Sequence, residues 1–140
     1  MFSLRSALLG LGMLLAVSAT QAQEARVKAN IPFDFMVGNK VLPAGEYLVS
    51  PQGDTNHAIL VRSEAGDSFA LATTQTCSSA NPSSSTKLVF HTVGGQYFLS
   101  QIWTEGYDQG RQLPKSKNEV QMAKNHMKSD TLVLAASLTR

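Results

Sequence analysis

The sequence predicts a mainly β fold, a single-domain antiparallel β-sandwich or small barrel with one short C-terminal helix. Apolar and polar residues alternate over residues 27–37, which is typical of a strand with one buried face. Two β-rich runs, residues 87–93 and 96–103, flank Gly94-Gly95, a dipeptide suited to a tight hairpin turn. The chain has 140 residues, which is the usual size of one domain, so we expect a single core.

The first predicted strand contains a proline near its middle. Pro32 cannot donate a ladder hydrogen bond, so it indicates either an edge position or a bulge. Turn residues follow at Gly38-Asn39 and at residues 42–45. Three more extended runs lie at residues 46–50, 57–62 and 68–74.

The hairpin around Gly94-Gly95 has a predicted register. A two-residue turn places Val93 opposite Gln96, Phe90 opposite Leu99, and Lys87 opposite Ile102. Each face of this hairpin is then apolar: Leu88, Phe90, Tyr97, Leu99 and Trp103 share one face, and Val89, Val93, Phe98 and Ile102 share the other. We therefore expect a central position, with both faces covered.

Loops and a helix are expected around and after this hairpin. Residues 75–86 are rich in Ser, Thr, Asn and Pro and predict a flexible loop, and residues 104–114 also read as a loop. Ser116 and Glu119 have the spacing of a capping box, which predicts a short helix ending near residue 128. Its apolar side would be Val120, Ala123 and Met127. Residues 131–138 predict a closing strand, for a total of about seven strands.

Residues 1–22 predict a secretory signal peptide. Arg5 precedes an uncharged apolar stretch over residues 7–17, and small residues follow, with cleavage expected after Ala19 or Ala22. The apolar stretch is shorter than the roughly twenty residues that a transmembrane helix needs. We therefore expect export, with residues 23–140 forming a β-rich domain in the periplasm or outside the cell.

The charge and the cysteine count of the chain limit the kinds of partner that we expect. The net charge is +2, with twelve basic and ten acidic residues, which provides little attraction for nucleic acid or an anionic membrane. The chain has one cysteine, Cys77, so an internal disulfide is impossible, and a disulfide-linked dimer through Cys77 is the remaining cross-link.

No catalytic or metal-binding pattern persists when its context is considered. Gly66-Asp67-Ser68 resembles a hydrolase serine motif, but Ser68 stands between two expected strands rather than at a strand-to-helix turn. The three histidines, at positions 57, 91 and 126, lack the spacing of a zinc site. We therefore expect a protein that is not an enzyme and has no cofactor or metal.

One loop has the composition of a binding surface. Trp103, Tyr107, Arg111 and Lys115, with Lys117 beyond them, bring aromatic rings and cations together, as interface hot spots do. Our hypothesis is that this loop docks on an envelope protein or surface component. The alternative is that Trp103 completes the core and the cations are simply solvated.

A second function is kept open. A small β-barrel can carry an apolar ligand in its interior, and this carrier would have a cavity lined by aromatic residues: Phe33, Phe35, Phe90 and Phe98.

Four separated blocks of sequence carry a resemblance to a known family. They are Leu-Pro-Ala-Gly-Glu-Tyr at residues 42–47, Lys-Leu-Val-Phe-His at 87–91, Phe-Leu-Ser-Gln-Ile-Trp at 98–103, and Gly-Arg-Gln-Leu-Pro-Lys-Ser at 110–116. In this order, behind a signal peptide, they resemble a family of small exported bacterial proteins of unknown function. The resemblance implies a compact exported protein and supplies no site residues. The sequence thus predicts an exported, non-catalytic binding or structural module of the bacterial cell envelope.

Overall fold

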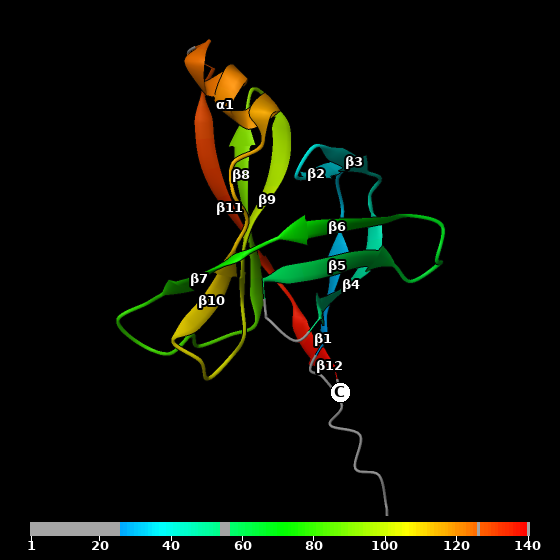
Figure 1. Cartoon of the computed structure of the whole chain (residues 1–140), viewed down its shortest axis with the longest axis vertical. Helices are drawn as coiled ribbons and strands as arrows, with labels where there is room; N and C mark the ends of the chain where they lie inside the picture. Colours follow the sequence, from blue (N-terminus) through cyan, green and yellow to red (C-terminus); the bar gives the residue numbers. More distant parts are fainter. Residues whose placement is uncertain (1–25, 54–56, 126, 140) are drawn as a thin grey trace, which may run out of the picture.

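Two packed β-sheets and one helix make up the computed structural model, which describes residues 26–53, 57–125 and 127–139 (Figure 1). The prediction of a mainly β fold with one short C-terminal helix is confirmed. Neither sheet closes on itself within the described residues, so the sandwich is the alternative that the structure supports. In Figure 1, β5 and β6 run across the direction of β8 and β9, as in sandwiches whose sheets cross steeply. Among the described residues, no helix has both the length and the apolar character needed to cross a bilayer.

The first sheet has five antiparallel strands in the order β12-β1-β4-β5-β6. Its members are β1 (Arg26–Ile31), β4 (Gly45–Gln52), β5 (Ala58–Ser63), β6 (Phe69–Thr73) and β12 (Ser137–Thr139).

The second sheet has a path of five strands in the order β11-β8-β9-β10-β7, with a small hairpin attached to β9. The path comprises β7 (Gln75–Ser78), β8 (Lys87–Val93), β9 (Gln96–Trp103), β10 (Gln109–Gln112) and β11 (Ser129–Ala135), and the hairpin comprises β2 (Phe35–Val37) and β3 (Lys40–Leu42). The hairpin turns at Gly38, as predicted, and joins β9 through a parallel pairing of Met36 with Phe98.

Two segments that were predicted as single strands are divided between the sheets. The strand expected over residues 27–37 ends at Ile31, and Pro32 begins a crossing that leads into β2 of the other sheet. Pro32 lies beyond the end of β1 and belongs to no strand, so it is neither of the predicted alternatives, an edge position or a bulge, and instead marks where the strand ends. The strand expected over residues 131–138 is likewise divided between β11 and β12. The chain therefore joins the two sheets near both ends of the fold.

The β8–β9 hairpin contains a one-residue bulge. Gly94 and Gly95 both have positive φ, at 58° and 82°, so the predicted turn is confirmed. Val93 lies opposite Gln96 and Phe90 opposite Leu99, as expected, but the next pair is Val89 with Gln101. Ser100 is therefore the extra residue of the bulge.

The bulge reverses the faces of every residue that follows it in β9. Lys87 faces Trp103 and not Ile102, so the predicted third pair was wrong. Ile102 consequently joins Leu88 in the core between the sheets, whereas Trp103 moves to the outer face. A shift of one residue exchanges faces because side chains alternate with a period of two.

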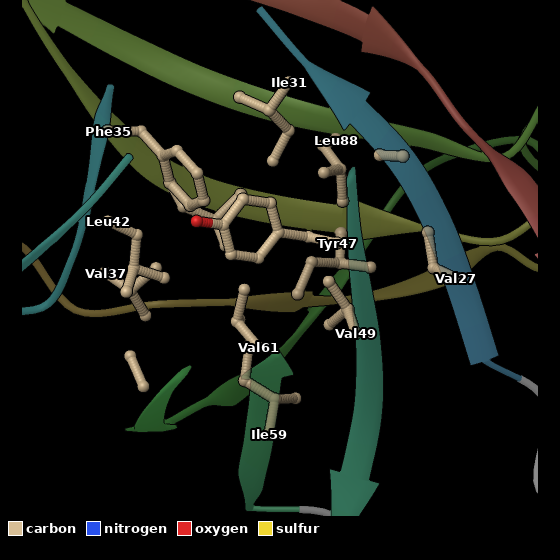
Figure 2. Close-up of a cluster of buried hydrophobic side chains, with 14 of the residues drawn as sticks. Val27, Ile31, Phe35, Val37, Leu42, Tyr47, Val49, Ile59, Val61 and Leu88 are labelled. Atoms are coloured by element: carbon tan, nitrogen blue, oxygen red, sulfur yellow. The ribbon is translucent and has the colours of Figure 1, made fainter. Parts of the chain in front are cut away.

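The core is built from the inward faces of both sheets. Tyr47 and Phe35 pack edge to face, with ring centroids 5.0 Å apart, and Figure 2 shows the two rings side by side. Phe35 also packs against Phe90 of the second sheet. The Tyr47 hydroxyl donates a 2.6 Å hydrogen bond to the Pro43 carbonyl, so its one polar group is satisfied. Burial raises the pKa of Tyr47, which keeps this hydroxyl protonated.

Two segments that were predicted as loops contain strands. Residues 75–78 form β7 and residues 109–112 form β10, and the two pair with each other, Cys77 lying opposite Gly110. Most of their side chains are exposed, which explains why neither segment shows an apolar period of its own.

The helix α1 (Lys117–Lys124) begins where it was predicted and ends earlier. The Ser116 side chain accepts a hydrogen bond from the Glu119 amide at 3.1 Å, which confirms the N-terminal cap. The expected apolar side was wrong, because Val120, Ala123 and Met127 are exposed. The helix is instead held by buried Glu119 and by Met122, which packs against the small cluster of Met36, Val93 and Phe98.

We predict that Tyr47→Phe lowers the free energy of unfolding by about 1–2 kcal/mol, because the Pro43 carbonyl loses its partner while the ring packing is retained. Chemical denaturation followed by circular dichroism measures this effect. Tyr107→Phe is the matched control, since its ring is exposed and the change should stay within about 0.5 kcal/mol. Equal midpoints for Tyr47→Phe and the unaltered protein would contradict the stabilising role of the hydroxyl.

Candidate functional site

A groove opens between the two sheets at the end of the sandwich where β1, β4 and β5 meet β9 and β10. Its volume is about 460 Å³, within the range of roughly 300–1,000 Å³ typical of ligand sites. Apolar side chains from both sheets form its walls: Val27, Val49, Ile59, Ile102 and Leu138. Polar groups surround these walls: Ser50, Thr76, Thr104, Tyr107, Gln109 and Arg111. The groove is therefore amphipathic, with an apolar interior and a polar rim.

Tyr107 stands at the rim on the short loop between β9 and β10. The backbone holds this loop, because the Ser83 amide donates to the Tyr107 carbonyl at 2.9 Å and the Gly106 amide donates to the Ser83 carbonyl at 2.9 Å. Gly106 has a φ of 87°, a conformation that favours glycine. The side chain of Tyr107 is 62% exposed, so a rigid loop presents its ring to solvent beside the groove.

Arg111 crosses the mouth of the groove from the second sheet to the first. It lies in β10, paired with Ile102 and Thr76. Its Nη1 donates to the Ala58 carbonyl of β5 at 3.5 Å. The guanidinium therefore links the two sheets as well as lining the groove.

Trp103 lies behind the groove rather than in it. Its ring is buried against Gly110, and its Nε1 donates to the Gln101 side chain at 2.9 Å. Gly110 itself lines the groove. Trp103 therefore supports one wall from the outer side of the sheet, where the bulge has placed it.

Lys115 and Lys117 lie away from this groove. Lys115 lines a second pocket together with His91 and Glu119, and Lys117 is the exposed first residue of α1. Of the residues that the sequence grouped as one binding loop, the structure brings Tyr107 and Arg111 together in the groove, with Trp103 behind them.

The second pocket adjoins a partly buried polar cluster that sequence reasoning missed. His91 Nδ1 lies 2.8 Å from Glu119 Oε1, and His91 Nε2 lies 3.2 Å from Ser100 Oγ. This is the order of groups in a serine-hydrolase triad. Ser100, however, is only 5% exposed, and the pocket is lined by His91 and Glu119 but not by Ser100.

The connection of this cluster to the helix indicates a structural role. Glu119 is the third residue of α1 and His91 lies in β8, so the pair fixes the helix against the sheet. The Leu113 amide donates to the Ser100 carbonyl at 2.8 Å, so the segment leading to α1 covers the bulge. The capping-box spacing found Glu119 as a helix residue, but no local signal connects it with His91 in the sequence.

Cys77 lies in β7 and is partly buried. Burial raises the pKa of its thiol, which lowers the thiolate fraction near neutral pH and reduces its reactivity. Among residues 26–53, 57–125 and 127–139, no three His, Cys, Asp or Glu side chains come close enough to hold a metal ion. His126 lies outside the described residues.

Comparison of the chain with protein-family models, curated proteins and solved structures gives no significant match. The resemblance carried by the four sequence blocks therefore stays a prediction, and the groove has to be interpreted from its own chemistry.

We predict that Gly110→Ala destabilises the protein by about 1–3 kcal/mol, as overpacking of a tight site does. A Cβ at this position would lie 2.8 Å from two Trp103 ring atoms and 2.9 Å from the Ile102 carbonyl oxygen, and the backbone oxygen cannot move cheaply. Thermal unfolding followed by Trp103 fluorescence measures the loss. Gln109→Ala on the neighbouring exposed residue is the control, and no difference between the two variants would contradict the packing of Trp103 on Gly110.

Proposed function

We propose that the chain is an exported, non-catalytic binding module of the bacterial cell envelope that captures a protein partner at the groove between its sheets. The predicted leader at residues 1–22, which lies outside the described residues, supports export to the periplasm or the cell exterior. The groove and its rim support binding as the activity of the domain.

The observation that carries this proposal is the exposed Tyr107 ring beside an apolar groove. A rigid aromatic ring next to a pocket is the usual composition of an interface hot spot, because it buries a large area with little loss of conformational freedom. The groove walls would receive an apolar side chain of the partner. The hydroxyl and amide groups of the rim would satisfy polar groups around it.

The Ser100–His91–Glu119 cluster is the strongest argument for an enzyme. Its geometry nevertheless favours a structural role over a catalytic one. A nucleophilic serine must reach the substrate and lie near donors for the developing oxyanion. Ser100 is buried in the middle of a strand, beneath the segment that leads to α1. The cluster is better explained as the attachment of α1 to the sheet.

A carrier of an apolar ligand is the second candidate, and the groove is the feature that favours it. Three of the phenylalanines expected to line an interior cavity pack on one another, since the Phe90 ring contacts both Phe33 and Phe35. The fourth, Phe98, is buried against Met36 and Val93. A small apolar molecule would therefore have to bind in the open groove, whose volume is large enough to hold such a molecule.

We predict that Tyr107→Ala reduces recovery of the partner at least tenfold, because the hot-spot ring is lost while the loop is still held by its backbone bonds. The measurement is affinity capture from bacterial envelope extracts with quantitative mass spectrometry, followed by titration of the purified partner. Arg111→Ala should act in the same direction.

Lys115→Ala is the control for both variants, because Lys115 lies at the other pocket, and it matches Arg111→Ala in removing one positive charge. Circular dichroism should show that all variants are folded. If Tyr107→Ala and Lys115→Ala capture the same proteins equally well, the groove is not the binding surface. Native mass spectrometry of the purified protein tests the carrier: a small molecule that is bound to the unaltered protein and lost in Tyr107→Ala would replace our proposal with the second candidate.

A further inference from the structure

All three methionines that follow the predicted leader gather at one end of the second sheet. The chain has five methionines, and two of them, Met1 and Met13, belong to residues 1–22. The other three come from separate segments: Met36 from β2, Met122 from α1, and Met127 from the segment between α1 and β11. Figure 1 shows α1 over the end of β8 and β9 where their hairpin turns. The fold therefore brings together thioether side chains that lie far apart in the sequence.

Met122 and Met127 converge on Gly94 at the turn of this hairpin. A Cβ at Gly94 would lie 2.5 Å from Met127 Sδ and 2.8 Å from Met122 Cε. The two side chains therefore meet over the Cα of this glycine. Any larger residue at this position would fill the space that the two thioethers share.

Backbone hydrogen bonds hold the two methionines in this position. The Met127 amide donates to the Met122 carbonyl at 3.4 Å, which closes the turn between the two residues. The Gly94 amide donates to the Lys128 carbonyl at 3.1 Å, which fastens the same segment to the hairpin. The backbone thus sets where the two residues stand, while their unbranched side chains keep rotatable bonds with which to adjust.

The surroundings of this pair differ from those of a methionine that only fills the core. Met36 is a core-filling residue, since it is 6% exposed and clusters with Val93 and Phe98. Met122 packs against that cluster on one side and is half-buried. Met127 is 45% exposed. The pair therefore has an apolar floor on one side and solvent on the other, so an ion can reach it.

We propose that Met122 and Met127 form a binding site for a soft monovalent cation, Cu(I) in particular. Thioether sulfur is polarisable and uncharged, and it prefers soft metals such as Cu(I) to the hard cations that bind carboxylate and carbonyl oxygen. A rotation of the two flexible side chains would direct both sulfur atoms at one ion above Gly94, where the absence of a Cβ leaves room. This inference does not depend on the groove or on the capture of a protein partner.

The charges near the pair favour a monovalent ion. Lys124 and Lys128 stand on either side of Met127 in the sequence, at the end of α1 and in the segment that follows it. Their positive charges repel a divalent cation about twice as strongly as a monovalent one at the same distance. The site should therefore discriminate against ions such as Zn²⁺ by charge as well as by ligand type.

Methyl nuclear magnetic resonance with Ag(I), a redox-stable substitute for Cu(I), tests the proposal. The methionine methyl groups carry carbon-13, and Cys77 is replaced by Ser so that its thiol does not bind silver. We expect one equivalent of Ag(I) to shift the signals of Met122 and Met127 together, and to leave the other methionine signals, including that of Met36, close to their positions. Cu(I), kept reduced by ascorbate, should shift the same two signals. This measurement needs no change at the site itself.

Calorimetric titration of variants identifies the ligands. Met122→Leu and Met127→Leu, made in the Cys77→Ser protein, should each weaken Ag(I) binding at least tenfold, because leucine keeps the apolar volume and removes the sulfur. Met36→Leu is the matched control, since it makes the same change at a buried methionine and should leave the affinity for Ag(I) unchanged. Circular dichroism should show that all three variants are folded.

Several results would overturn the proposal. One is the absence of any methyl shift with Ag(I), and another is a shift of Met127 alone, which would indicate silver on a single exposed sulfur. Equal shifts at every methionine, or silver shifts that Cu(I) does not reproduce, would count against it in the same way. An equal loss of affinity in Met36→Leu and Met122→Leu would contradict the assignment of the pair as the ligands.

Discussion

The one-residue bulge at Ser100 is the constraint on which the rest of the structure depends. It inserts a residue between Leu99 and Gln101, and so reverses the faces of the end of β9. Ile102 becomes a wall of the groove and part of the core, while Trp103 moves outward and rests on Gly110. Without this shift, Gln101 would lie opposite Leu88 where Ile102 now lies, Trp103 would face the core, and the wall formed by β10 would lose the support of its indole ring.

Local signals predicted the turns and the helix start, but not the bulge. Gly94-Gly95 specifies the hairpin and Ser116 specifies the cap because both act through backbone geometry within a few residues. The bulge left no such trace, since both faces of the hairpin are apolar and either register buries a similar surface. The division of residues 27–37 between two sheets was equally hidden, because the alternation of side chains continues on both sides of Pro32.

Sequence reasoning likewise found only part of the candidate site, because local signals identify single residues and not the contacts between distant segments. Tyr107 and Arg111 were found from their chemistry, and β10 then brings them to one groove. Lys115 was grouped with them by proximity in sequence, but the chain has already turned toward α1 at that point. The His91–Glu119 pair joins β8 to the helix over a separation of 28 residues, and a single sequence shows no periodic pattern for a contact of that kind.

Nuclear magnetic resonance of isotopically labelled protein tests the bulge most directly, through nuclear Overhauser effects between the backbones of β8 and β9. The account predicts contacts of Gln101 with Val89 and of Trp103 with Lys87, beside those of Leu99 with Phe90. An uninterrupted ladder, in which Ser100 contacts Val89 and Ile102 contacts Lys87, would contradict it. The groove wall and the support of Gly110 by Trp103 would then have no basis.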